Sequence, residues 1–359
     1  MKKGFKRLLS GLIIAAVLLC SLWFLQRLLS PKYANEIIEG RLISEYYDNA
    51  GGNDVIFVSD CECYENISPI KLWEDYGITS YIRGSSQQLI WQSYYLLEET
   101  LKYETPKLVV FNVLSMKYNE PQNEAYNRMT LDGMKWSSSK WNSIKASMTD
   151  EESAITYLFP ILRYHSRWSE LSAEDFEYLF SAKKSFHQGY LMRVDVRPVE
   201  DYPTVTPLAD YNFGDNAWYY LEKITQLCKD NNIPLVLMKA PSISPVWYDE
   251  WDSQIKEYAK KNDLLYINFL ERLDEVGIDW NTDTYDNGLH LNLSGAEKLS
   301  EYFGKILQEK YSLPDHRSDP EMSARWQKYV DFYNEMRDDQ YRELEEYGYL
   351  KSYGARAPK

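Results

Sequence analysis

The chain has 359 residues, of which 44% are hydrophobic and 26% charged, and its formal net charge is −14. A charge balance this acidic argues against nucleic-acid binding, because nucleic-acid-binding proteins present a basic face to phosphates. Of the four cysteines, Cys20 lies in the apolar N-terminal segment and Cys61 and Cys63 are nearly adjacent, which leaves little for a disulfide framework. Neither a zinc-type Cys/His spacing nor a Gly-rich phosphate-binding motif occurs. We therefore expect no metal and no cofactor.

The chain begins with a basic cluster, Lys2, Lys3, Lys6 and Arg7. An uncharged, mostly apolar segment follows from Leu8 to Leu25. About 20 apolar residues span a bilayer as a helix, and a basic cluster before the span marks its cytoplasmic side. Residues 1–30 therefore predict a cytoplasmic tip and a single transmembrane anchor, with the rest of the chain extracellular. A cleaved signal peptide is the alternative, although Trp23 and its neighbours stand where small residues would be expected.

Residues 31–53 are interpreted as a stalk and linker. Four apolar residues in this segment suggest a short helix: Ile37, Ile38, Leu42 and Ile43. Residues 54–312 then alternate between strand-like and helix-like segments, which predicts a parallel sheet with helices on both faces. Short apolar runs indicate strands at 54–58, 78–82, 107–111, 235–238 and 264–267.

Residues 115–210 interrupt this alternation with a segment rich in aromatic residues and arginine. We expect a lid or cap over the strand ends, in which Arg163 and Arg167 contact the substrate, because binding groups concentrate on loops over a rigid scaffold. Residues 313–359 predict a charged helical tail with one aromatic face. Docking on the parent domain is the preferred interpretation of that face, and a partner surface is the alternative.

The first strand runs directly into Ser59-Asp60-Cys61-Glu62. Parallel sheets place their chemistry at the carboxyl ends of strands, so Cys61 is a candidate nucleophile and Ser59 the reserve hydroxyl. A free cysteine is more often a small buried residue. A thiol beside an imidazolium, however, would be expected to lose its proton and become a strong nucleophile.

A second polar segment, residues 283–292, precedes the C-terminal helix and contains His290, one of only four histidines. An imidazole held by a carboxylate is what a general base requires. Asp286 is the first candidate for that carboxylate, and Asp283 is the reserve. The following helix is expected to begin at Ser294, with Glu297 completing a capping box.

Together the two segments resemble the SGNH/GDSL hydrolase superfamily. In that superfamily the nucleophilic serine follows the first strand in a Gly-Asp-Ser block, and the base lies in a late Asp-x-x-His block that often continues His-Leu-Asn and Gly-Ala. Here His290-Leu291-Asn292 and Gly295-Ala296 match that continuation. Two departures stand out: Cys61 occupies the nucleophile position, and Asn287 stands three residues before the histidine. The resemblance implies a flavodoxin-like three-layer α/β/α fold.

Two further blocks come from the second and third predicted strands, which end at Arg83-Gly84 and at Asn112. The resemblance implies that the Gly84 backbone N–H and the Asn112 side-chain amide form an oxyanion hole, which stabilises charge developing on a carbonyl oxygen. Arg83 and Lys239 lie at strand ends expected to face the site, so both are further candidates for substrate binding.

The resemblance also implies acyl-ester chemistry at the outer face of a membrane. It is closest to the DltD-type proteins of teichoic-acid D-alanylation and to the alginate-acetylation proteins, which act beside a membrane-bound O-acyltransferase. The expected substrate is an acylated polysaccharide or teichoic-acid-like polymer, and the O-acyltransferase is the expected partner. A simple esterase or deacetylase is one alternative. A catalytically silent subunit that binds or scaffolds a polymer-modifying complex is another.

Overall fold

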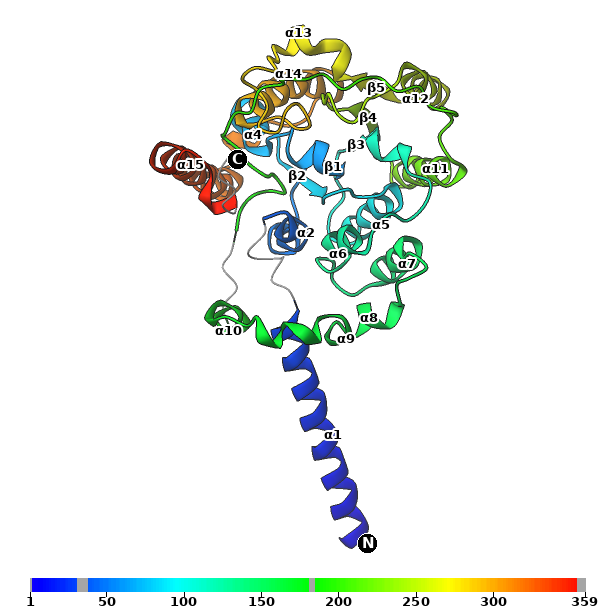
Figure 1. Ribbon diagram of the computed structural model, residues 1–359, viewed down its shortest axis with the longest axis vertical. Helices are drawn as coiled ribbons and strands as arrows, with labels where there is room; N and C mark the ends of the chain where they lie inside the picture. The colour runs from blue at the N-terminus through cyan, green and yellow to red at the C-terminus, as the bar shows by residue number, and fades with distance from the viewer. Residues whose placement is uncertain (1, 31–37, 181–184, 354–359) are drawn as a thin grey trace.

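The computed structural model describes residues 2–30, 38–180 and 185–353. Within them, five strands form one fully parallel sheet in the order β2-β1-β3-β4-β5 (Figure 1). The strands are β1 (Val55–Ser59), β2 (Ser80–Gly84), β3 (Leu108–Asn112), β4 (Leu235–Lys239) and β5 (Leu265–Asn268). This flavodoxin-like order confirms the predicted fold class. It also places the switch point of the sheet between β1 and β3, where this class binds ligands.

Successive side chains along each strand alternate between the two faces of the sheet, so each strand contributes to the apolar core on both faces. Val55 and Phe57 join an apolar cluster with helices α4 (Pro69–Tyr76) and α14 (Leu293–Tyr311). Ile56 and Val58 join a second cluster with α5 (Ile90–Thr100), α11 (Asp215–Asp230) and α12 (Asp249–Asn262). Because successive side chains point to opposite faces, a strand buried on both sides must be apolar throughout, as these are.

The segment interpreted as a stalk is instead part of the domain. Helix α2 (Ile38–Asn49) packs against β2, and Leu42, Ile43 and Tyr46 are fully buried. The Tyr81 hydroxyl of β2 donates to the Leu42 carbonyl at 2.9 Å. The expectation of a stalk was therefore wrong for this helix, since its apolar stripe is covered by the sheet. Ile37 lies outside the described residues.

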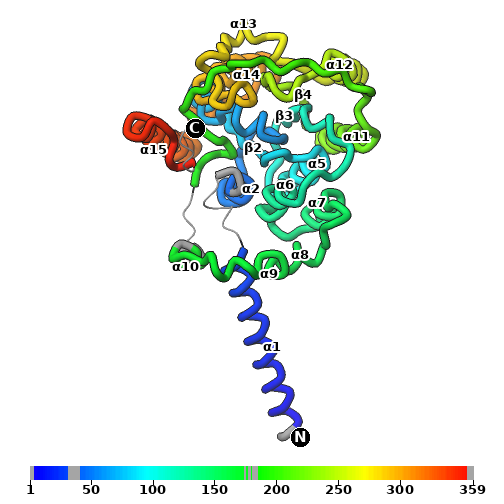
Figure 2. Tube along the Cα trace, viewed as in Figure 1, coloured from blue at the N-terminus to red at the C-terminus, as the bar shows by residue number. Residues whose placement is uncertain are grey.

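The 115–210 insertion matches the expected cap only in part: its residue Arg197 lies on the His290 loop, where its N–H donates to the Thr284 carbonyl at 2.9 Å, but its helices lie elsewhere. It contains α6 (Glu124–Leu131), α7 (Ser138–Ser147), α8 (Ala154–Leu158), α9 (Ile161–Tyr164) and α10 (Ala173–Phe180). Helices α9 and α10 contact the N-terminal helix α1 (Lys2–Leu29). Figures 1 and 2 show α8 to α10 at the end of the body where α1 enters, whereas α13 (Leu273–Val276), α14 and the loop joining them lie at the opposite end. These three helices therefore do not cover the His290 loop.

Helix α1 has the length and composition of a membrane span. Within its segment Gly4–Leu29, an 18-residue window has a mean hydropathy of 2.5, and none of that window is buried against the body. Figure 1 shows it projecting away from the domain as a single rod. A signal sequence has the same properties, so composition alone supports either an anchor or a signal.

The C-terminal tail forms the long helix α15 (Pro320–Tyr347) and docks on the domain. Asp319 caps its N-terminus, and Pro320 occupies its first turn. Trp326 is buried and stacks on Trp73 of α4, with ring centroids 4.9 Å apart. The aromatic face predicted from the sequence therefore packs on the parent domain.

Removing the Trp326 ring tests this docking. Trp326→Ala should lower the free energy of unfolding by about 3–5 kcal/mol, because it removes a buried aromatic ring and leaves a cavity. Tyr341→Ala, at a half-exposed position of the same helix, is the control and should cost much less. Denaturant unfolding of both variants measures the difference, and equal small losses would show that α15 adds little to the fold.

Candidate functional site

Cys61 lies at the carboxyl end of β1, where the sequence places it. Asp60 follows the last residue of β1 and is the N-cap of the short helix α3 (Cys61–Tyr64), where its side chain accepts a hydrogen bond from the Glu62 N–H at 3.3 Å. Cys61 is the first residue of that helix and is partly exposed. The cap therefore sets the position of the thiol relative to the sheet edge.

His290 meets Asp286 through a tight turn. Its Nδ1 lies 2.7 Å from Asp286 Oδ2, and its backbone N–H donates to Asp286 Oδ1 at 2.8 Å. Asn287 and Gly288 between them have positive φ values of 65° and 86°, which folds the chain back within four residues. This left-handed turn accommodates the four-residue separation of Asp286 and His290.

The structure brings the thiol and the imidazole together and adds a carboxylate that sequence reasoning missed. Ligand-type atoms of Cys61, Glu65 and His290 all lie within 4.8 Å of one another. Glu65 Oε2 is 3.5 Å from His290 Nδ1 and accepts a hydrogen bond from the Tyr285 hydroxyl. The Tyr285 ring lies nearly parallel to the imidazole, with centroids 6.1 Å apart. The available signal was the four-residue spacing from Cys61 to Glu65, which puts both on one side of a helical turn.

The protonation of the pair follows from burial and from these carboxylates. Burial raises the pKa of Cys61 above its ordinary value, and the neighbouring His290 offsets this only in part. Burial alone would lower the pKa of His290, but Glu65, Cys61 and Asp286 together raise it well above 6.5. Burial therefore disfavours the Cys61 thiolate and the carboxylates favour the His290 imidazolium, two effects that oppose each other in the expected ion pair.

The remaining ring nitrogen of the histidine is available for chemistry. His290 Nε2 is buried and makes no hydrogen bond of good geometry with the described residues. Because Nδ1 is engaged by Asp286, Nε2 is the atom that can exchange a proton with Cys61 or a bound substrate. Thiol, carboxylate and imidazole are also the types of group that bind zinc, and with Nδ1 engaged, His290 would offer a metal only Nε2.

Beneath the thiol lies a buried ionic cluster. Lys239 Nζ contacts both carboxylate oxygens of Glu62 at 2.8 and 2.9 Å, the Ser242 hydroxyl at 3.0 Å and the Ala240 carbonyl at 2.6 Å. Both charged side chains are essentially inaccessible to solvent. Since an ammonium group has three donors, the protein uses all of them. Lys239 is therefore a structural ion-pair partner and was wrongly expected to bind substrate.

Asn112 belongs to the same cluster. Its Nδ2 donates to Glu62 at 3.0 Å and approaches Asp60 at 3.5 Å, while its Oδ1 accepts from the Ala240 N–H at 2.9 Å. The amide is fully buried. In this arrangement both of its N–H groups are engaged, so its expected donation to an oxyanion is not available. Gly84 lies at the end of β2 against the Ser59 carbonyl and the Tyr64 ring, and its oxyanion role stays a prediction.

The reserve residues lie elsewhere. The Ser59 hydroxyl is buried and bonds Asp60 and the Asn112 carbonyl at 3.1 and 3.3 Å. Asp283 Oδ2 accepts from Lys298 at 2.7 Å. Both side chains are buried and hydrogen-bonded within the protein.

Three arginines expected to bind substrate are not at this site. Arg83 is fully buried below α2, where its Nη1 donates to the Ile43 carbonyl at 3.1 Å and its guanidinium lies 4.0 Å from the Tyr46 ring centroid. Arg163 pairs with Glu124 on the surface. Arg167 donates to backbone carbonyls at the end of α1. The expectation failed because the side chain of Arg83 leaves the strand on the α2 side, and α9 and the turn after it lie beside α1.

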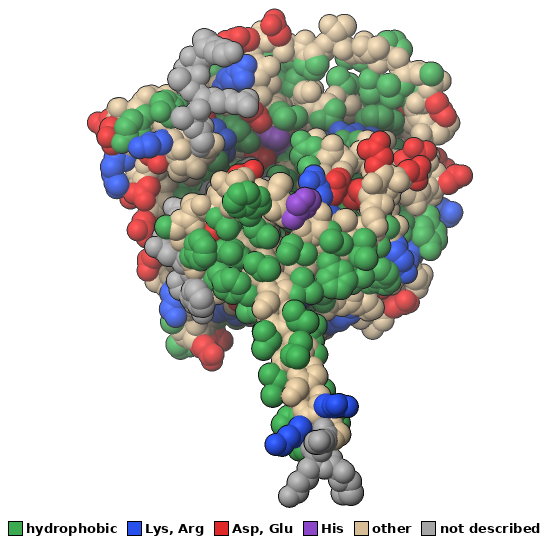
Figure 3. Space-filling model, turned by 60° about the horizontal axis from the view of Figure 1, so that its bottom comes forward, with side chains coloured by type: hydrophobic (Ala, Val, Ile, Leu, Met, Phe, Trp, Pro, Cys, Tyr) green, Lys and Arg blue, Asp and Glu red, His purple; other side chains and the backbone are tan. Residues whose placement is uncertain are grey.

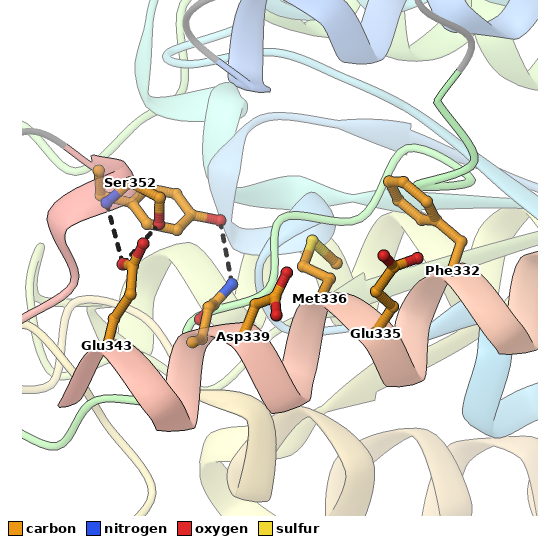
Figure 4. Close-up of a pocket in the computed structure, with 8 residues that line it drawn as sticks. Phe332, Glu335, Met336, Asp339, Glu343 and Ser352 are labelled. Atoms are coloured by element: carbon orange, nitrogen blue, oxygen red, sulfur yellow. Dashed lines mark hydrogen bonds between the residues drawn. The ribbon is translucent and has the colours of Figure 1, made fainter. Parts of the chain in front are cut away.

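A separate groove lies on α15 (Figure 4). Its walls include Glu335, Asp339 and Glu343, and Ser352 donates to Glu343 from both its N–H and its hydroxyl. None of its lining residues is a cysteine or histidine. The groove is therefore an acidic feature distinct from the thiol–imidazole site.

Comparison with known proteins gives limited information. No family model matches the chain, and no curated protein matches it. Among solved structures, the chain is similar to a putative acylhydrolase from Bacteroides fragilis, with 12% identity over 76% of this chain and 96% of the other, at a TM-score of 0.38. It is also similar to a GDSL-like lipase from Bacteroides thetaiotaomicron, with 14% identity over 77% of this chain and 98% of the other, at a TM-score of 0.37.

The raised pKa values predict an alkaline pH dependence. Alkylation of Cys61 by iodoacetamide should be slow at neutral pH and rise as the pH exceeds the ordinary thiol range, because only the thiolate reacts. Glu65→Gln removes a negative charge that raises the pKa of both Cys61 and His290, so the rate profile should shift to lower pH. Glu309→Gln, at an exposed site on α14, should leave the profile unchanged. An unshifted profile in Glu65→Gln would show that Glu65 does not govern the pair.

Proposed function

We propose that the protein is a membrane-anchored acyl-ester enzyme of the SGNH type, which transfers or hydrolyses acyl groups on cell-wall or exopolysaccharide hydroxyls outside the membrane. The observation that carries the proposal is the nucleophile–base–carboxylate arrangement at the switch point of a parallel sheet. Cys61 stands beside His290, whose Nδ1 is held 2.7 Å from Asp286.

The chemistry follows from this geometry. In the form of the pair that holds a single proton, Cys61 Sγ attacks the ester carbonyl and the proton of the pair resides on His290 Nε2, which then protonates the departing alcohol and leaves an acyl thioester on the cysteine. A polymer hydroxyl or water next attacks the thioester, giving its proton to His290, and the proton returns to the released thiolate. Asp286 keeps the ring oriented and stabilises its charged form throughout.

The position of the site supports a polymeric substrate. The loop that carries His290 joins α13 to α14, at the end of the body away from α1 (Figures 1 and 2). A substrate that extends away from the bilayer, such as a polysaccharide or teichoic-acid-like chain, reaches that end more readily than a membrane lipid does. A membrane-bound O-acyltransferase is the proposed partner, since it would supply the acyl group from the membrane.

A catalytically silent subunit is the second candidate, and one observation favours it. The Asn112 amide is committed to Glu62, so the donor expected in an oxyanion hole is engaged inside the protein. Under this reading the site would bind an acylated polymer without turning it over, and Cys61 would be dispensable for the activity of a larger complex.

The two candidates differ in what the thiol does. Cys61→Ala should reduce hydrolysis of a small activated ester by about 10³-fold or more, because loss of the nucleophile removes the covalent route. Cys63→Ala, at a buried cysteine two residues on, is the matched control and should retain activity. Mass spectrometry of the quenched wild-type protein should find an acyl group on Cys61. Full activity in Cys61→Ala would favour the silent subunit.

The proposed topology has its own test. With the basic cluster inside and the body outside, protease added to intact cells should digest the body and leave a fragment containing α1 in the membrane. The full-length protein should retain its N-terminal residues. A mature form that begins after residue 25 would identify a signal peptide. Protection of the body from protease in intact cells would show that the orientation is the reverse of the proposed one.

A further inference from the structure

An unusual concentration of exposed apolar side chains lies between residues 155 and 176. Six large hydrophobic side chains there are 39% to 72% exposed: Ile155, Leu158, Phe159, Leu162, Trp168 and Phe176. They belong to α8, α9, the 3₁₀ turn η3 (His165–Ser169), α10 and the residues joining them, which we call the collar. A contiguous patch of this kind on a protein surface marks an interaction site.

The collar is amphipathic. Ile155 and Leu158 lie three residues apart in α8, and Leu162 lies in α9; all three side chains are exposed. Tyr157 and Tyr164 point the other way and are buried, Tyr157 in a cluster that includes Ile43 of α2. The collar therefore already uses one face to pack on the body, and its apolar outer face has no partner among the described residues.

The collar surrounds the end of the N-terminal helix. Arg167 donates to the carbonyls of Leu29 and Ser30 at 3.1 and 2.9 Å, satisfying backbone groups that a helix end leaves free. Asp175 of α10 lies 3.4 Å from the same guanidinium. Figure 3 shows hydrophobic side chains gathered on the body around the base of the projecting helix, so the apolar surface of α1 continues into that of the collar.

The length of α1 sets the level of the collar relative to a bilayer. About 20 helical residues cross a hydrocarbon core of about 30 Å. Counted from Leu8, directly after the basic cluster, such a span ends near Arg27, whose guanidinium lies 5.7 Å from the Trp23 ring. Leu28 and Leu29 follow at once and are buried. The far boundary of the membrane thus falls where the collar begins.

We propose that the collar lies in the outer leaflet of the bilayer, with its exposed face at the boundary between headgroups and acyl chains. This inference goes beyond the proposed function and rests on its membrane anchor. Amphipathic helices lie in that plane with their apolar face inserted, and tryptophan is enriched there, as Trp168 would be. Insertion of the collar would give the protein a second contact with the membrane in addition to α1. It would also hold the His290 loop on the side away from the membrane.

Photocrosslinking of the full-length protein in vesicles tests this seating. Benzoylphenylalanine is placed in place of Leu158 or Trp168, both exposed, and the protein is reconstituted into phosphatidylcholine–phosphatidylglycerol vesicles. Irradiation should give protein–lipid adducts at both positions, detected by mass spectrometry. The probe at Ile14 in α1 reports the anchor, and the probe at Tyr202, which is exposed outside the collar, should give no lipid adduct.

The outcomes separate the collar from the anchor. Lipid adducts at Ile14 but not at Leu158 or Trp168 would overturn the collar proposal and leave the anchor standing. No adduct at Ile14 would overturn both. The same probes in intact cells should also capture lipid; dominant crosslinks from the collar to another protein would show that the face is a protein interface, and would overturn the proposal.

Discussion

The buried ion pair between Glu62 and Lys239 is the interaction on which the candidate site depends. Glu62 comes from α3, directly after Cys61, and Lys239 ends β4, so the pair ties the helix that carries Cys61 to the far side of the switch point. Asn112 at the end of β3 adds a third attachment. Removing one partner of such a pair costs about 3–5 kcal/mol, because the other charge is left buried and unpaired. The cluster therefore positions the thiol more than it contributes net stability.

Above this cluster, the site places an unusual amount of negative charge around one imidazole. Asp286 orients the ring through Nδ1, and Glu65 lies 3.5 Å from the same atom. Opposite charges at such distances favour the imidazolium, and burial disfavours the thiolate. The same carboxylates that hold the ring in place therefore also raise the pKa of the imidazole. Geometry and reactivity are coupled through Glu65, which the Tyr285 hydroxyl holds in turn.

The two ends of the body serve different purposes. One end receives α1 and carries the amphipathic collar, and the other carries the loop between α13 and α14 with His290. The sheet and its helices form a rigid connection between them, since both faces of the sheet are packed. Under the proposed function, this arrangement would hold the protein at the membrane by α1 while the His290 loop faces material beyond it.

The sequence by itself determined the sheet and the tail helix, and it indicated the thiol and imidazole that the structure brings together, because these follow from local patterns. Apolar runs form buried strands, and turn residues such as Gly288 bring Asp286 back to His290. The carboxyl end of a parallel strand is also a position where a functional site can be predicted from sequence. One local error remained: helix α14 is capped by Asn292 instead of Ser294, while Glu297 accepts from Tyr333.

Only the tertiary structure decided which polar side chains are already ion-paired or hydrogen-bonded inside the protein. Lys239 and Glu62 are 177 residues apart in the chain, and Arg83 finds its partners on α2, which precedes the sheet. No local pattern shows that such side chains are already paired. The insertion was likewise readable as helical and apolar, but its place beside α1 depends on Arg167 meeting the end of that helix. The periodicity of hydrophobic residues cannot predict long-range pairing, because it indicates the face that a residue occupies and not which residue lies opposite it.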